Sequence, residues 1–105
     1  MSCTKILNIK IDSIKTIQAN DYYSNITSEK YDKTIISNYS LKKWEAILPK
    51  KHFLRIHRSS IINLNYVESI EKKDNNTYVV KIKGIEKNIN MSRRYAKTVL
   101  EKFQF

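Results

Sequence analysis

The residues of this chain best suited to chemistry are four arginines, which occur as two close pairs. Arg55 and Arg58 form the first pair, Arg93 and Arg94 form the second, and the other sixteen cations are lysines. A guanidinium group is a planar fork of donors that can bind guanine O6 and N7, or two phosphate oxygens, at once. Arg58 is followed by Ser59, whose hydroxyl also suits a phosphate oxygen. The pattern therefore indicates contact with a nucleic acid.

The charge of the chain indicates the same class of partner. The 105 residues carry a net charge of +10, and the pI is about 9.7. Residues 1–40 contain five lysines and four acids, whereas residues 41–105 contain fifteen cations and six acids. A positive field concentrated in one part of a small protein is typical of polyanion binding. We expect phosphate contacts from the following cations: Lys50, Lys51, Arg93 and Lys97.

Enzymatic chemistry is not favoured by the other residue types. The chain has one glycine, which excludes glycine-rich phosphate-binding loops. His52 and His57 are five residues apart, without the cysteines or paired carboxylates that would complete a metal site. On an extended segment the side chains of Ser59 and His57 are expected to splay apart, and no orienting acid is nearby, so a nucleophile and base pair is not expected. We expect no enzyme and no cofactor, and we expect His57 to hold the end of its strand by hydrogen bonding.

Most of the chain has the hydrophobic pattern of β-strands, which must therefore position the arginine pairs. Residues 53–57 alternate between two faces, so that a strand ends directly before Arg58. Turns are expected at Asn20–Asp21, at residues 28–30 and 74–76, and at Gly84. The other strands and short elements are expected at residues 7–11, 14–19, 22–27, 33–37, 67–72, 77–83 and 85–89.

Two segments have helical periodicity instead. Ser40 is suited to cap a helix over residues 41–48, in which Trp44 belongs to the apolar stripe, and Pro49 ends it. Ser92 is suited to cap a final helix. The apolar face of this helix is expected to contain Tyr95 or Ala96, Val99, Leu100 and Phe103. Because a long strand-rich segment separates the helices, we expect a mainly-β fold with two short helices and no helix-turn-helix.

The sequence resembles the LytTR family of bacterial DNA-binding domains from about residue 12 to residue 103. The motifs that carry the resemblance are Arg55–Ser59, Ile62–Leu64 and Ser92–Tyr95. It implies a single domain over residues 1–105, built as an elongated set of antiparallel sheets. It also implies that loops at strand ends enter successive major grooves on one face of double-stranded DNA.

The resemblance assigns DNA contacts to particular residues. Arg58 falls on a position that contacts bases, and Ser59 falls on a phosphate contact. Arg94 falls on the base contact at the start of the last helix, with Ser92 as helix cap and phosphate donor.

A third contact follows the segment Ile17–Ala19 in the family. By spacing it falls on Ser24 or Asn25, and the Asn25 amide can bind adenine.

Partners and location follow from the resemblance and from the composition. The expected partner is double-stranded DNA with repeated half-sites. The domain is expected to form a weak homodimer on this DNA. An upstream receiver domain or a sensor kinase pathway is expected to control it. No receiver domain is present within the 105 residues. The chain lacks the roughly 18–20 apolar residues of a membrane span and has no signal peptide, and its lone Cys3 gives no disulfide framework. We therefore expect a cytoplasmic bacterial protein with no membrane partner.

Two other classes of function stay open. A small β RNA-binding module would use exposed aromatic side chains, with Tyr22 and Tyr23 as candidates, to stack on unpaired bases. A protein-interaction module would instead sequester another regulator.

Overall fold

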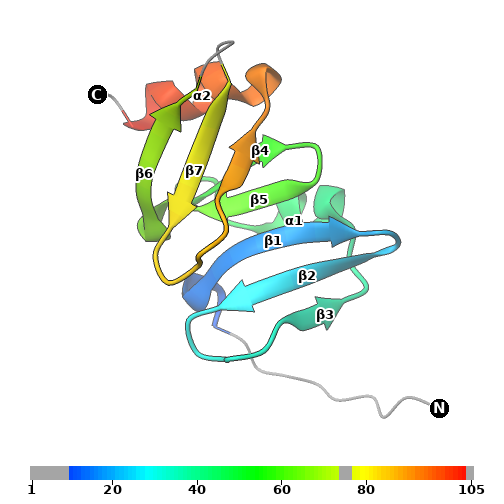
Figure 1. Cartoon of the computed structure of the whole chain (residues 1–105). Coiled ribbons are helices and arrows are strands. Elements are labelled where there is room, and N and C mark those ends of the chain that lie inside the picture. Colours follow the sequence, from blue (N-terminus) through cyan, green and yellow to red (C-terminus); the bar gives the residue numbers. More distant parts are fainter. Residues whose placement is uncertain (1–9, 74–76, 104–105) are drawn as a thin grey trace, which may run out of the picture.

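The fold is built mainly from antiparallel strands, as predicted (Figure 1). The computed structural model describes residues 10–73 and 77–103. Within these residues, eight strands form two antiparallel sheets, and two α-helices pack against them. The molecule measures 46 × 24 × 24 Å along its principal axes, which is the elongated shape that the resemblance implied.

The larger sheet has the strand order β3-β2-β1-β5-β4, and every neighbouring pair is antiparallel. Its strands are β1 (Ile14–Asn20), β2 (Tyr23–Ser28), β3 (Ile35–Ser37), β4 (Phe53–His57) and β5 (Ser60–Asn63). The order places the beginning of β5 beside the end of β1, because Gln18 pairs with Ser60. The turn after β4 therefore lies next to the hairpin that follows β1.

The smaller sheet has the order β6-β7-β8 and is joined to β5 by a short 3-10 helix, η2 (Leu64–Tyr66). Its strands are β6 (Val67–Lys72), β7 (Tyr78–Ile82) and β8 (Ile89–Met91). The predicted pairing of residues 67–72 with residues 77–83 is confirmed, whereas the turn predicted between them, at 74–76, lies outside the described residues.

Both helices begin where the serine caps were predicted. The hydroxyl of Ser40 accepts the N–H of Lys43 at 3.1 Å and caps α1 (Leu41–Ile47). Leu48 is the last cap residue of this helix, and Pro49 comes after it. The hydroxyl of Ser92 accepts the N–H of Arg94 at 3.2 Å at the start of α2 (Arg93–Phe103). A side-chain oxygen at this position satisfies a backbone donor that the first helical turn leaves unpaired.

Two hydrophobic clusters form the core, and the β4–β5 hairpin contributes to both. Phe53 and Ile61 pack beneath α1, whereas Ile56 and Ile62 pack with the smaller sheet and α2. The first cluster also contains Ile14, Ile17, Ile26, Leu41 and Leu48, and the second contains Val80, Ile82, Ile89, Met91, Ala96 and Val99. The turn that carries Arg58 is therefore fixed relative to both parts of the molecule.

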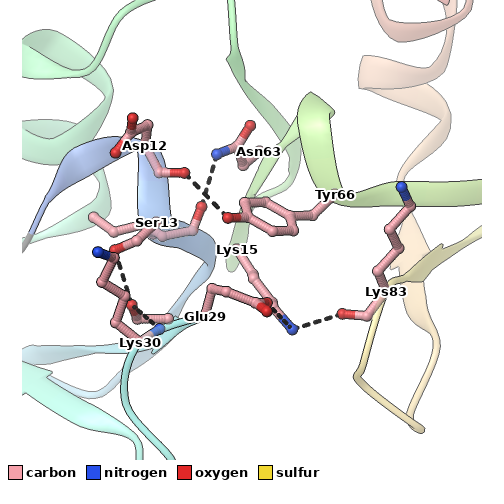
Figure 2. Close-up of polar contacts among 10 residues, drawn as sticks. Asp12, Ser13, Lys15, Glu29, Lys30, Asn63, Tyr66 and Lys83 are labelled. Atoms are coloured by element: carbon pink, nitrogen blue, oxygen red, sulfur yellow. Dashed lines mark hydrogen bonds and ion pairs between the residues drawn. The ribbon is translucent and has the colours of Figure 1, made fainter.

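A polar clasp also joins the two sheets (Figure 2). The Lys15 amine is largely buried, lies 2.9 Å from a carboxylate oxygen of Glu29, and donates to the carbonyl of Lys83 at 2.8 Å. Gly84 has φ +77, and a Cβ there would lie 2.6 Å from the Lys15 amine. Only glycine combines this backbone conformation with so close an approach.

Two predicted strands differ from the structure. Residues 7–9 of the expected first strand lie outside the described residues, and Ile11 begins a 3-10 helix, η1 (Ile11–Ser13). The strand expected at 85–89 is found at Ile89–Met91 instead. Gly84 turns the chain, and the exposed polar residues after Ile85 have no strand to pair with until Ile89.

Candidate nucleic-acid interface

Arg58 and Ser59 form the two-residue turn between β4 and β5, and the backbone of this turn is tied down at several points. The Nδ1 atom of His57 accepts the N–H of Ser59 at 3.2 Å and lies 2.8 Å from the Ser59 hydroxyl. The Ser59 carbonyl accepts the N–H of Ala19 at 2.9 Å. The predicted role of His57 in holding the strand end is confirmed, whereas the expectation that its side chain and that of Ser59 splay apart is wrong, because the turn brings them into hydrogen-bond contact. The Arg58 side chain is exposed at this turn.

The start of α2 lies beside this turn. The N–H of Ser92 donates to the carbonyl of Ile56 at 2.8 Å. This hydrogen bond holds the start of α2 next to the end of β4, so the two segments that carry the arginines lie side by side. Arg94 is exposed, and its guanidinium carbon lies 5.7 Å from the centre of the Tyr95 ring, within cation–π range.

The β1–β2 hairpin is the third turn of the same region. Its two-residue tip is Asp21–Tyr22, and Asp21 has φ +55. Tyr22 is 90% exposed and Tyr23 is 51% exposed. Figure 1 shows the tip of this hairpin, the β4–β5 turn and the start of α2 along one side of the molecule. Neighbouring turns of this kind can follow one face of a long ligand.

The structure corrects the assignment of the third contact. Ser24 is 0% exposed, and its hydroxyl accepts the indole N–H of Trp44 at 2.9 Å, so this side chain is not available to a base. Asn25 is half-buried on the opposite face of β2, where its Oδ1 lies 3.5 Å from the amide nitrogen of Asn20. The turn closes after two residues and puts Tyr22 at the tip, so of the two residues that spacing offered only Asn25 has an accessible side chain.

We expect Ser24→Ala to affect the stability of the domain, and Asn25→Ala to leave its stability nearly unchanged. Ser24→Ala leaves the Trp44 indole N–H without its acceptor and should lower the free energy of unfolding by about 1–2 kcal/mol. It should leave base preference unchanged. Asn25→Ala should change stability by less than about 0.5 kcal/mol and alter binding only if the amide touches DNA. Chemical denaturation and binding curves on single-base variants measure both. A change of base preference in Ser24→Ala would contradict the burial argument.

The cations predicted to bind phosphate lie in two separate places. Arg93 and Lys97 are exposed on the first two turns of α2, close to Arg94. Lys50 and Lys51 precede β4, so the full length of that strand separates them from the Arg58 turn. Lys50 instead lines a groove of about 300 Å³ with Lys102, near the other end of α2. Lys50 and Lys51 therefore lie a strand's length away from the turn that carries Arg58.

The structure adds polar residues that sequence reasoning missed. A concavity of about 150 Å³ beside the β4–β5 turn is lined by Gln18, His57, Ser59, Ser60, Lys87, Asn88, Ile89 and Asn90. A second concavity, of about 480 Å³, is lined by His57, Thr77, Tyr78, Asn90, Met91, Ser92 and Arg93. His57 and Asn90 belong to both, so a polar surface runs from the end of β1 to the start of α2. The only sequence signal for Lys87 was the Gly84 turn, which brings it here.

Within residues 10–73 and 77–103, the cations of this surface have no carboxylate partners. Among the residues that the structure describes, three ion pairs are found, Lys15–Glu29, Arg55–Glu45 and Lys81–Glu68. None of them involves Arg58, Lys87, Arg93, Arg94 or Lys97. Exposed cations without carboxylate partners keep their full attraction for a polyanion. In the part of the chain covered by the structure, neither helix is long and apolar enough to cross a membrane.

Comparisons with known proteins identify the family of the chain. Residues 4–104 match the model of the LytTr DNA-binding domain family. The chain is similar to the transcriptional regulatory protein YpdB of Escherichia coli O6:H1, with 30% identity over 95 residues, 85% of this chain and 39% of that protein. It is also similar to the sensory transduction protein LytT of Bacillus subtilis, with 31% identity over 87 residues, 83% of this chain and 36% of that protein.

A solved structure has the same fold. It is the LytTr DNA-binding domain of a Bacillus cereus protein described as a methyl-accepting/DNA response regulator, with a TM-score of 0.82 and 26% identity over 92% of this chain and 86% of that one. The chain belongs to the LytTr DNA-binding domain family. It spans less than two fifths of the length of the two regulators named above.

Proposed function

We propose that this domain binds double-stranded DNA sequence-specifically, with its three neighbouring turns directed into the major groove. The observation that carries the proposal is the row formed by the β1–β2 tip, the β4–β5 turn and the start of α2. The second and third of these present exposed arginines that have no carboxylate partner among the described residues. The family membership supports the same ligand. Because β1, β4 and β5 hold the turns by backbone hydrogen bonds, little order has to be gained on binding.

Each residue of the row has a proposed role. Arg58 and Arg94 contact base edges, because each is exposed and has a guanidinium fork that suits guanine. The proposed phosphate contacts are Ser59, Lys87, Ser92, Arg93 and Lys97. Asn25 stays a proposed base contact on the outer face of β2, with Tyr22 ahead of it at the hairpin tip.

The domain is proposed to be the output part of a bacterial transcriptional regulator. The similar proteins YpdB and LytT are named as a transcriptional regulatory protein and a sensory transduction protein, and each is much longer than this chain. We propose that residues 1–105 act as a single DNA-binding domain in the cytoplasm, controlled by a receiver domain or a sensor kinase pathway. We propose that the domain binds repeated half-sites and forms a weak homodimer on DNA. The proposed DNA contacts lie on one side of the domain, which leaves the other sides free for a second copy.

The proposed interface should give a strong dependence of duplex affinity on salt. The three cationic phosphate contacts, Lys87, Arg93 and Lys97, with the charges of Arg58 and Arg94 beside them, should give a slope of log K against log salt of about −3 to −4.5. Titrations of one duplex at four salt concentrations measure it, with Lys50→Gln as a control that should leave the slope nearly unchanged. A slope near zero would remove the electrostatic basis of the proposal.

A single-stranded RNA ligand is the second candidate, favoured by the exposure of Tyr22 and Tyr23 at the hairpin tip. Single-stranded RNA tested at one of these salt concentrations separates the two functions. Tighter binding to RNA than to duplex, lost in Tyr22→Ala, would support the RNA-binding module instead.

A further inference from the structure

We infer that Arg55 is a positioning residue, which holds the β4–β5 turn so that Arg58 meets one base pair. The inference rests on the proposed function of Arg58. Arg55 belongs to the same sequence pair as Arg58, but the two side chains have different surroundings. The Arg55 side chain is 17% exposed and makes three hydrogen bonds within the protein, whereas that of Arg58 is exposed.

The Arg55 guanidinium binds three groups at once. Its Nε donates to the carbonyl of His57 at 3.0 Å, one terminal nitrogen donates to the carbonyl of Arg58, and the other donates to the carboxylate of Glu45 at 3.0 Å. Two of these acceptors are backbone groups in the turn region, and the third belongs to α1. The side chain therefore ties the turn to a helix of the core.

A β-bulge makes this tie necessary. Arg55 pairs with Ile61 and His57 pairs with Ser60, so Ile56 has no partner in the β4–β5 register. A bulge bends its strand and changes the direction of the residues after it. Arg55 bridges the bulge to the His57 carbonyl, while the Ile56 carbonyl accepts the N–H of Ser92 at the start of α2. The direction of the Arg58 turn thus depends on both contacts.

Lysine at position 55 would keep the charge but not these contacts. An ammonium is a single point of donation and lacks the planar fork that reaches two carbonyls and a carboxylate together. Arg55→Lys should therefore leave the net charge of the domain unchanged and loosen the turn. Glu45→Gln should loosen it less, because the two carbonyl contacts remain.

The first test is binding of the full chain to its preferred duplex, to single-base variants and to scrambled duplex. Arg58→Ala identifies one single-base variant that it no longer distinguishes from the preferred duplex. In the wild type, the ratio of the affinities for these two duplexes measures the base preference due to Arg58. This ratio should fall about tenfold in Arg55→Lys. It should fall less in Glu45→Gln. Glu68→Gln, which removes the same charge and breaks the Lys81 pair in the smaller sheet, should leave it unchanged. Partial unfolding lowers affinity equally on every duplex, so a purely structural role would not change the ratio.

The second test is amide relaxation of the free domain, which does not depend on DNA. Arg58 and Ser59 should become more mobile on the nanosecond timescale in Arg55→Lys but not in Glu68→Gln. Two results would overturn the inference and leave the proposed function standing. The first is a turn that stays as rigid in Arg55→Lys as in the wild type. The second is an equal loss of affinity on all duplexes in Arg55→Lys, while the loss in Arg58→Ala depends on the base. If Arg58→Ala itself loses affinity equally on all duplexes, base contact by Arg58 fails and the inference fails with it.

Discussion

Arg58→Ala is expected to weaken binding to the preferred duplex by about 1–3 kcal/mol, roughly 5- to 150-fold, and to abolish preference at one base pair of each half-site. The side chain makes no hydrogen bond or ion pair within the described part of the molecule, and the backbone carbonyl that Arg55 binds is kept. The free energy of unfolding should therefore change by less than about 0.5 kcal/mol. Binding curves on the preferred duplex, on single-base variants and on scrambled duplex measure the effect.

Arg94→Ala provides the comparison for this experiment. It should relax preference at a different base pair, because Arg94 lies in the first turn of α2, whereas Arg58 lies in the turn after β4. Lys97→Ala should weaken binding about equally on all duplexes, as expected for a phosphate contact. If Arg58→Ala and Arg94→Ala behave like Lys97→Ala, both arginines bind phosphate only.

Asn63→Ala is expected to give the largest loss of stability among single polar changes, about 2–3 kcal/mol. Asn63 is 0% exposed, and its amide nitrogen donates to the carbonyl of Ile14 at 2.8 Å across the sheet (Figure 2). Its Oδ1 accepts the N–H of Asn65 at 2.9 Å and caps η2, which leads into β6. Alanine would leave a buried carbonyl and a backbone N–H without partners.

Chemical denaturation of Asn63→Ala measures this loss, and Asn65→Ala is the matched control. Asn65 is exposed, so its side chain should contribute less than about 0.5 kcal/mol. A loss in Asn63→Ala no greater than in Asn65→Ala would show that the amide does not secure the junction between the sheets.

Local patterns predicted the elements that carry the site. Ser40 and Ser92 cap their helices because capping depends on a few adjacent residues. The alternation over residues 53–57 placed Arg58 at the end of a strand, and His57 holds that end through Ser59. These features were accessible because each depends on neighbours in the chain.

Other features depend on contacts between distant residues and could not be predicted in this way. The role of Arg55 requires Glu45 on another element and a bulge in β4. Lys87 joins the surface because Gly84 turns the chain toward the start of β5. For the β1–β2 hairpin, the turn signal at Asn20–Asp21 was present in the sequence, but spacing from a family motif could not decide between Ser24, which is buried, and Asn25.

The most direct test of the proposed interface is an amide chemical-shift titration of the domain with its preferred duplex. The largest shifts are expected at the β1–β2 tip, the β4–β5 turn, the segment 87–90 and the first turn of α2. Scrambled duplex should give smaller shifts in the same places, because phosphate contacts remain when base contacts are lost. Largest shifts on β3, or in the groove that Lys50 and Lys102 line, would contradict binding through these three turns.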